Sequence, residues 1–130
     1  MCEKYIPWRP FALSGRHARL AFDGMRTHEG SLYIDLHQEL NPSVRFSMFF
    51  DDLPLAMRFS NESFRLKSLR SILKPVNDSL YFVDNSNFLC DFHDESVGIY
   101  RDDGLTHISL LTDEWFDFVV GDLPTFVFHK

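Results

Sequence analysis

Acidic and aromatic side chains gather in the C-terminal part of this sequence, where they could form a binding surface. The acids occur within 91–95, 102–103, 113–117 and at 122. Rings anchor an interface while carboxylates steer and orient a basic protein, so this composition favours binding of a basic protein partner. The residues predicted to bind that partner are Tyr100, Asp102, Asp103, Asp113, Glu114, Trp115 and Asp117. The simpler alternative is that these acids only keep a Phe-rich fold soluble.

The best candidate for a metal site is the segment Cys90–Glu95, which holds thiol, imidazole and carboxylate groups. These are the ligand types of zinc, but no pair has the spacing of a known zinc motif and a second pair of ligands is missing. The simpler interpretation is a short amphipathic helix whose acids face water. We therefore predict no metal and no cofactor.

Catalytic motifs are equally sparse. Cys90 could act as a nucleophile with a distant histidine, but a buried, inert thiol is the simpler interpretation. Ser14 and Gly15 lack the glycine pattern of a nucleophile elbow, and no glycine-rich phosphate loop occurs. We predict a non-enzymatic protein without catalytic residues. The rival hypothesis is an enzyme or small-molecule sensor with a pocket between sheet and helices, where His93 or His107 would meet Asp117.

Charge and composition narrow the classes of partner. The chain has 130 residues and a net charge of −6, and its 14 Phe allow a substantial core. The acidic balance argues against nucleic acid and against anionic lipid, and it weakly favours a basic partner. No apolar run approaches the roughly 20 residues of a membrane span, and no signal peptide is recognised. Two cysteines do not make a disulfide framework, so a cytoplasmic location is expected.

Several segments alternate apolar and polar residues, which predicts antiparallel strands. Residues 31–40 and 44–50 alternate, a turn follows at 51–54, and 55–59 completes a first meander. Shorter strands are predicted at 80–83, 111–120 and 125–129, and the last could pair across a homodimer as an edge strand. Within 111–120, alternation places Phe116, Phe118 and Val120 in the core and Trp115, Asp117 and Val119 on the opposite face.

Two helices and a hairpin complete the prediction. Helical spacing of leucines and isoleucine spans 60–75, where Ser60 or Asn61 could cap the start. A second short helix is predicted over 85–96, capped by Asn85 or Ser86. Asp103–Gly104 predicts a type I′ turn inside a hairpin over 98–111.

The predicted fold class is α+β, with antiparallel β-meanders packed against two short helices in a single domain over 1–130. Residues 1–30 are expected to be an irregular N-terminal segment that packs on the core, because two prolines surround Trp8 and turn residues follow.

The C-terminal two thirds of the chain resembles a group of small, uncharacterised bacterial α+β proteins. The positions that carry the resemblance are Asn85, Ser86, Phe92, Glu95, Ser96, His107, Asp117 and Pro124, together with the segment FSNESFRLKSL. Ile108 and Phe118 depart from the pattern. The resemblance implies one α+β domain of bacterial, cytoplasmic origin and no catalytic role. By analogy with other small acidic bacterial proteins, we expect an immunity protein that neutralises a cognate toxin by direct contact.

Overall fold

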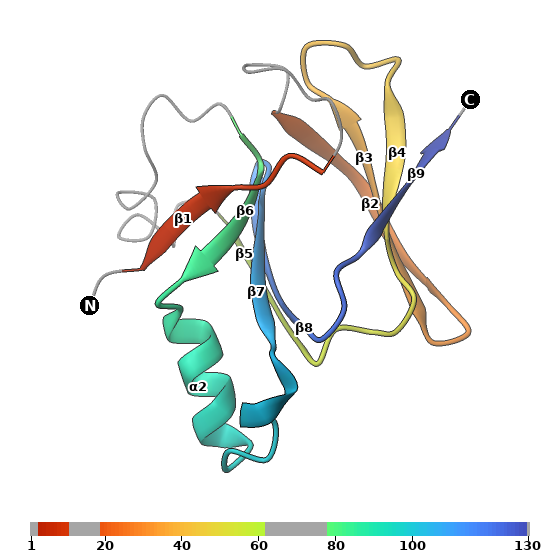
Figure 1. Cartoon of the computed structure of the whole chain (residues 1–130). Coiled ribbons are helices and arrows are strands. Elements are labelled where there is room, and N and C mark those ends of the chain that lie inside the picture. The colour runs from red at the N-terminus through yellow and green to blue at the C-terminus, as the bar shows by residue number, and fades with distance from the viewer. Residues whose placement is uncertain (1–2, 11–18, 62–77, 130) are drawn as a thin grey trace.

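Two antiparallel β-sheets face each other in the computed structural model, which describes residues 3–10, 19–61 and 78–129 (Figure 1). The first sheet runs in the order β1 (Lys4–Pro7), β6 (Leu80–Asp84), β7 (Thr106–Leu111), β8 (Glu114–Val120) and β5 (Ala56–Asn61). The second runs β2 (Leu20–His28), β3 (Ser31–Gln38), β4 (Arg45–Phe50) and β9 (Thr125–His129). Helix α2 (Asn87–Glu95) and a short 3-10 helix, η3 (Arg101–Asp103), connect β6 to β7.

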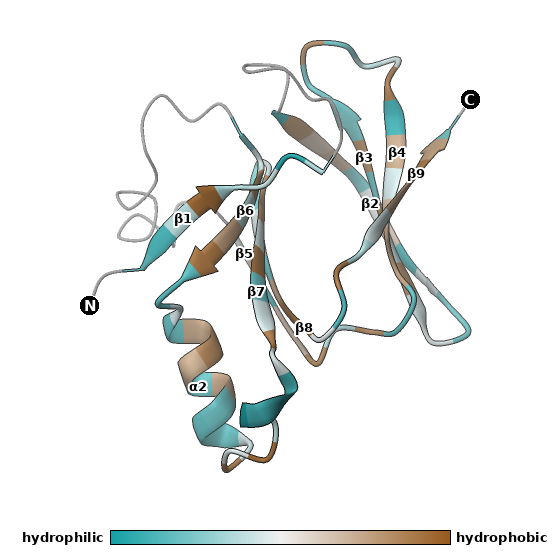
Figure 2. Cartoon of the chain, in the orientation of Figure 1, coloured by the Kyte–Doolittle hydropathy of each residue, from teal (hydrophilic) through white to brown (hydrophobic). Residues whose placement is uncertain are grey.

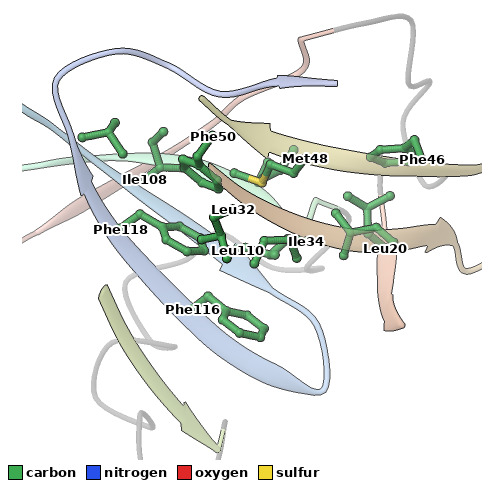
Figure 3. Close-up of a cluster of buried hydrophobic side chains, with 13 residues drawn as sticks. Leu20, Leu32, Ile34, Phe46, Met48, Phe50, Ile108, Leu110, Phe116 and Phe118 are labelled. Atoms are coloured by element: carbon green, nitrogen blue, oxygen red, sulfur yellow. The ribbon is translucent and has the colours of Figure 1, made fainter. Parts of the chain in front are cut away.

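The main core lies between the two sheets. Alternation along β3 buries Leu32, Ile34 and Leu36, as the sequence predicts, and the same period holds in β4. Figure 3 shows these side chains meeting rings and aliphatic groups from β7 and β8. Each fully buried side chain of this size contributes about 1.5–3 kcal/mol. The face that was expected to lie against helices is therefore covered by the opposite sheet. The described part of the chain is mostly β, with two antiparallel sheets and one α-helix, so the predicted α+β fold with two short helices is not what the structure shows.

A second, smaller core lies on the outer face of the first sheet. It consists of Tyr5, Tyr81, Val83, Leu111 and Trp115. β8, an inner strand between β7 and β5, therefore has both faces covered, and its residues are buried from Trp115 to Val120. Figure 2 shows apolar stretches on β1, β6 and β8, while α2 carries both polar and apolar residues.

The prediction of antiparallel strands is confirmed, but the irregular N-terminal segment is not. Residues 4–7 form β1 on β6, and residues 20–28 form β2 on β3. A register shift between Phe22 and Gly24 breaks the alternation of β2, and this bulge explains why its sequence pattern is weak. The expected packing of this region on the core is seen at Tyr5 and Leu20, which are buried.

The first predicted meander is wrong at its third strand. β5 pairs with β8 rather than with β4, so residues 51–55 cross from the second sheet to the first. Packed sheets lie about 10 Å apart, a distance that five residues span easily. A turn-rich segment thus fits a crossover as well as a hairpin.

One predicted helix is confirmed. Ser86 caps α2, because its hydroxyl accepts a hydrogen bond from the Leu89 amide at 2.8 Å. Cys90 on this helix is exposed, against the expectation of a buried thiol. The helix predicted over 60–75 falls outside the described residues, apart from Ser60 and Asn61, which end β5.

The hairpin predicted over 98–111 is also wrong. Gly104 does take a positive φ of 65°, but it ends η3 instead of forming a hairpin turn. β7 pairs with β6 and with β8, and the tight connection lies at residues 112–113. A glycine with a positive φ after an aspartate is compatible with a type I′ hairpin turn and with the end of a helix, so the Asp103–Gly104 dipeptide alone does not distinguish the two.

Candidate functional site

The seven residues predicted to bind a partner occupy three separate places. Tyr100, Asp102 and Asp103 lie at η3, before β7, whereas Asp113 and Glu114 lie at the turn after it. Six residues of β7 separate the two groups by about 20 Å. The remaining two lie inside β8. The predicted acidic surface is therefore not a single surface.

Trp115 and Asp117 are not surface residues at all, since both are 0% exposed. Alternation placed them on the correct side of β8, but that side is covered. The Trp115 ring packs edge-to-face on Tyr5 at a centroid distance of 5.9 Å. It is a core ring, and its predicted role as a partner anchor is wrong.

An acidic cleft forms where two of the connections between the sheets, residues 51–55 from β4 to β5 and residues 121–124 from β8 to β9, meet the end of η3. Its volume is about 380 Å³. It is lined by Phe50, Asp51, Asp52, Leu53, Leu55, Tyr100, Asp103, Leu105, Val120, Gly121, Asp122 and Leu123. Four lining residues are aspartates, and none of the described lining residues is basic. Two residues predicted from the sequence, Tyr100 and Asp103, thus belong to a real concave surface.

The apolar part of this acidic cleft is open to solvent. Leu53, Leu55 and Leu123 are each about half exposed. Leucines from two different crossovers therefore lie in one depression, framed by carboxylates. A surface of this kind can bury apolar area and attract positive charge at the same time.

A second candidate site is a chain of hydrogen bonds beneath α2, here called the buried relay: Ser86, His107 and Asp117. The Ser86 hydroxyl lies 2.6 Å from His107 Nδ1, and His107 Nε2 lies 2.7 Å from Asp117 Oδ1. Ser109 also donates to Asp117 Oδ1. Arg58 holds the other carboxylate oxygen, Oδ2, through Nε at 3.0 Å and Nη2 at 2.9 Å.

These contacts keep Asp117 ionised although it is buried. Burial alone would raise the pKa of Asp117, but the hydrogen bond and charge of His107, then Ser109 and Arg58, hold the pKa well below its ordinary value. The Arg58 guanidinium also lies 4.5 Å from the centre of the Phe88 ring, which ties the pair to α2.

The ionised carboxylate determines the tautomer of His107. A carboxylate only accepts hydrogen bonds, so His107 Nε2 must donate to it. When the ring is neutral, Nδ1 is a lone-pair acceptor and the Ser86 hydroxyl donates to it; when the ring is charged, Nδ1 donates to Ser86 instead. A serine, a histidine and a carboxylate are thereby arranged as in a general-base relay.

Ser86 lies at a strained turn beside an open pocket. Asn85, which precedes it, has a φ of 53°, and the chain passes from β6 through this turn into α2. The relay pocket has a volume of about 520 Å³. It is lined by Ile6, Phe82, Val83, Asp84, Asn85, Ser86, Leu89, Leu105, Thr106, His107 and Leu123. His107 itself is only 1% exposed, whereas Ser86 keeps 9% of its surface.

The rival hypothesis named the contact between His107 and Asp117, and the structure contains it. His93 is not part of the relay. Ser86 was interpreted only as a helix cap, because a serine before a helix is ordinary. The sequence holds one pointer to Ser86, because Ser86, His107 and Asp117 are three of the positions on which the expected resemblance to small bacterial proteins rests.

No three His, Cys, Asp or Glu side chains of the described residues lie close enough together to hold a metal ion. No helix within 3–10, 19–61 or 78–129 is long and apolar enough to cross a membrane. Comparisons of this chain with protein-family models, with curated proteins and with solved structures found no match.

Proposed function

We propose that this protein is an interaction domain that binds a basic protein partner at the acidic cleft. The observation that supports the proposal is the lining of the cleft: four aspartates surround exposed leucines, without a basic lining residue among those described. Two of the predicted contact residues, Tyr100 and Asp103, are included in this site. Asp102 borders it, and Asp113 and Glu114 do not belong to it.

The two kinds of side chain would contribute differently to binding. Burying the exposed parts of Leu53, Leu55 and Leu123 would supply affinity, at about 25 cal/mol per Å² of apolar area before the costs of association. Asp51, Asp52, Asp103 and Asp122 would steer the partner and orient it, mainly through the association rate. Such binding weakens as salt rises.

The specific form of this proposal is a bacterial immunity protein in the cytoplasm. A toxin that acts on an anionic substrate needs a basic active surface. Carboxylates of the acidic cleft would oppose that charge and block the surface by occlusion. A homodimer through the edge strand β9 is a separate proposal, which light scattering would test.

The binding test uses a defined probe, a 15-residue peptide that alternates lysine and leucine, and isothermal titration calorimetry. The double variant Asp51→Asn with Asp122→Asn should bind more weakly. Exposed charge pairs contribute about 0.2–1 kcal/mol each, so the loss should be roughly two- to thirtyfold. The matched control is Asp113→Asn, an exposed acid at the far end of β7. An equal loss in the control, or binding that is independent of salt, would contradict the proposal.

The immunity role has its own test. Co-expression with a toxin encoded beside this gene should restore growth with the wild-type chain and with Asp113→Asn, but not with the double variant of the cleft. If the double variant protects as well as wild type, the acidic cleft does not hold the toxin.

A further inference from the structure

We infer that Ser86 is an activated nucleophile and that the relay pocket accepts carboxylic esters with small apolar acyl groups. This activity is independent of the proposed partner binding. It rests on the geometry of the buried relay, because three side chains from β8, β7 and the β6–α2 turn form one continuous chain of hydrogen bonds.

The relay has the order that nucleophilic catalysis requires. Ser86 is at the pocket and His107 lies behind it, shielded from bulk water. Asp117 is a positioning residue that fixes the tautomer with Nδ1 free to accept the serine proton. A positioned general base typically accelerates such a step by about 10²–10⁴-fold.

A second serine in the chain shows the arrangement that does not activate a nucleophile. Ser47 on β4 also lies between a carboxylate and a histidine, Asp35 and His129. There the hydroxyl donates its hydrogen to Asp35 directly, and His129 Nε2 lies 2.7 Å from the same oxygen. The hydroxyl of Ser47 therefore donates to a carboxylate instead of a histidine, and Ser47 is also fully buried, so we expect no reaction at this serine.

The lining of the relay pocket indicates the class of substrate. Ile6, Phe82, Leu89, Leu105 and Leu123 form its apolar part, and none of the described lining residues is a lysine or arginine. An apolar acyl chain fits this lining better than a phosphate or a carboxylate. At about 520 Å³ the pocket holds a short acyl chain completely, whereas a long chain would extend into solvent and bury no further apolar area, so a short acyl chain suffices for binding.

The reaction proceeds in two balanced halves. Ser86 Oγ forms a bond to the ester carbonyl carbon while its proton passes to His107 Nδ1. The bond from that carbon to the alcohol oxygen then breaks, and the leaving alcohol takes the proton from Nδ1. Water attacks the acyl-serine with the same proton transfers, releasing the carboxylic acid and restoring Ser86.

The start of α2 can stabilise the negative oxygen of the intermediate. The Asn87 amide, the first of this helix, already donates to a carboxylate oxygen of Glu3 at 2.9 Å. An anionic oxygen is therefore accommodated beside Ser86, where the positive end of the helix dipole lies. An ester oxyanion would take this amide from Glu3, so Glu3→Gln should leave the reaction intact or accelerate it.

The test treats the full wild-type chain with a small alkyl fluorophosphonate and locates the adduct by mass spectrometry of its peptides. We expect one adduct on Ser86, formed at least about 100-fold faster than on Ser47 or any other serine, as general-base activation requires. p-Nitrophenyl butyrate should be hydrolysed faster than the laurate ester. Ser86→Ala should abolish both reactions. No adduct on Ser86 in the folded wild-type chain, or equal labelling of several serines, overturns the inference.

Two further readouts separate catalysis from a purely structural network. Nitrogen chemical shifts of His107 at pH 7 should show Nε2 protonated and Nδ1 free, and Asp117→Asn should change this distribution. A protonated Nδ1 in the wild-type chain overturns the inference. The acidic cleft shares Leu105 and Leu123 with the relay pocket, so Asp51→Asn serves as the separating variant. Unchanged labelling in Asp51→Asn is expected, and a comparable loss there would overturn the independence of the two sites.

Discussion

Replacement of Asp117 by alanine should cost more stability than any substitution of an exposed acid in the described chain. Asp117 is fully buried and accepts hydrogen bonds from His107, Ser109 and Arg58. Removing one partner of a buried pair typically costs about 3–5 kcal/mol, because the other group remains uncompensated.

The expected loss lies near the lower end of that range. The Arg58 side chain is 38% exposed and can turn toward water when its carboxylate is gone. His107 has no such route, since its side chain is 0% exposed, and it would lose the acceptor of Nε2. We therefore expect about 3 kcal/mol, a large part of the roughly 5–15 kcal/mol that stabilises a typical domain.

Equilibrium urea unfolding measures this loss. With a slope of about 2 kcal/mol per molar, the midpoint should fall by about 1.5 M. Asp113→Ala is the control, because it removes an exposed acid a few residues away in the same hairpin and should change stability by less than about 0.5 kcal/mol. If Asp117→Ala loses less than about 1 kcal/mol, the buried network does not hold the fold as described here.

A second variant, Asp117→Asn, tests the pH dependence of stability, whose sign follows from the lowered pKa of Asp117. A carboxylate with a folded-state pKa below its unfolded value stabilises the fold fully above the unfolded pKa, near 4. That contribution is lost as the pH falls through the folded-state pKa. The difference in unfolding free energy between wild type and Asp117→Asn should thus be constant from pH 7 to about 5 and shrink below pH 4. A difference that grows on acidification would refute the assignment.

Two further predictions concern the outer core of the first sheet. Trp115→Ala should lower the free energy of unfolding by about 3–5 kcal/mol in chemical denaturation, because the ring is fully buried. The control is Phe128→Ala, which should cost far less because Phe128 is 52% exposed. Similar losses in the two variants would contradict the burial of Trp115. Tyr81 donates to the Asp78 carbonyl at 3.0 Å, and burial, then the charge of Asp78, raises its pKa to about 12. One of the four tyrosines should therefore titrate near pH 12 in the ultraviolet, and Tyr81→Phe should remove this titration step. Because the folded-state pKa of Tyr81 is raised, the contribution of Tyr81 to stability is complete below about pH 10 and is lost as the pH rises from there through the folded-state pKa.

Alternation predicted which side chains of a strand share a face, but not what covers that face. Phe116, Phe118 and Val120 were assigned to the core, and they lie there. Trp115 and Asp117 were correctly assigned to the other face, which was taken to be exposed. A strand that is buried on both faces usually has apolar residues at every position. In β8 the sequence still looks alternating, because Asp117 is charged but is paired with other side chains inside the protein. The second face of β8 is buried by segments that are distant in the sequence, so the pattern of residues within β8 cannot predict that this face is covered.

Strand order was less predictable than strand location. β4 and β5 are neighbours in sequence but belong to different sheets, and the intervening residues are turn formers compatible with a hairpin or a crossover. The bulge in β2 likewise interrupts the alternation of apolar and polar residues by which this strand could have been predicted. Both failures concern hydrogen-bond partners between strands, which sequence periodicity within one strand does not encode.

Strand register could have predicted one of the two contacts of the buried relay, that between His107 and Asp117. A tight turn at 112–113 pairs Leu111 with Trp115, Ser109 with Asp117 and His107 with Val119. Asp117 and His107 are then diagonal neighbours on one face, within reach of each other. Choosing Asp103–Gly104 as the hairpin turn concealed this pair. Ser86 was beyond such reasoning, because its position depends on how α2 packs against β7. A contact that combines local register with tertiary packing therefore requires the structure, and chemical labelling of Ser86 tests whether that contact is catalytic.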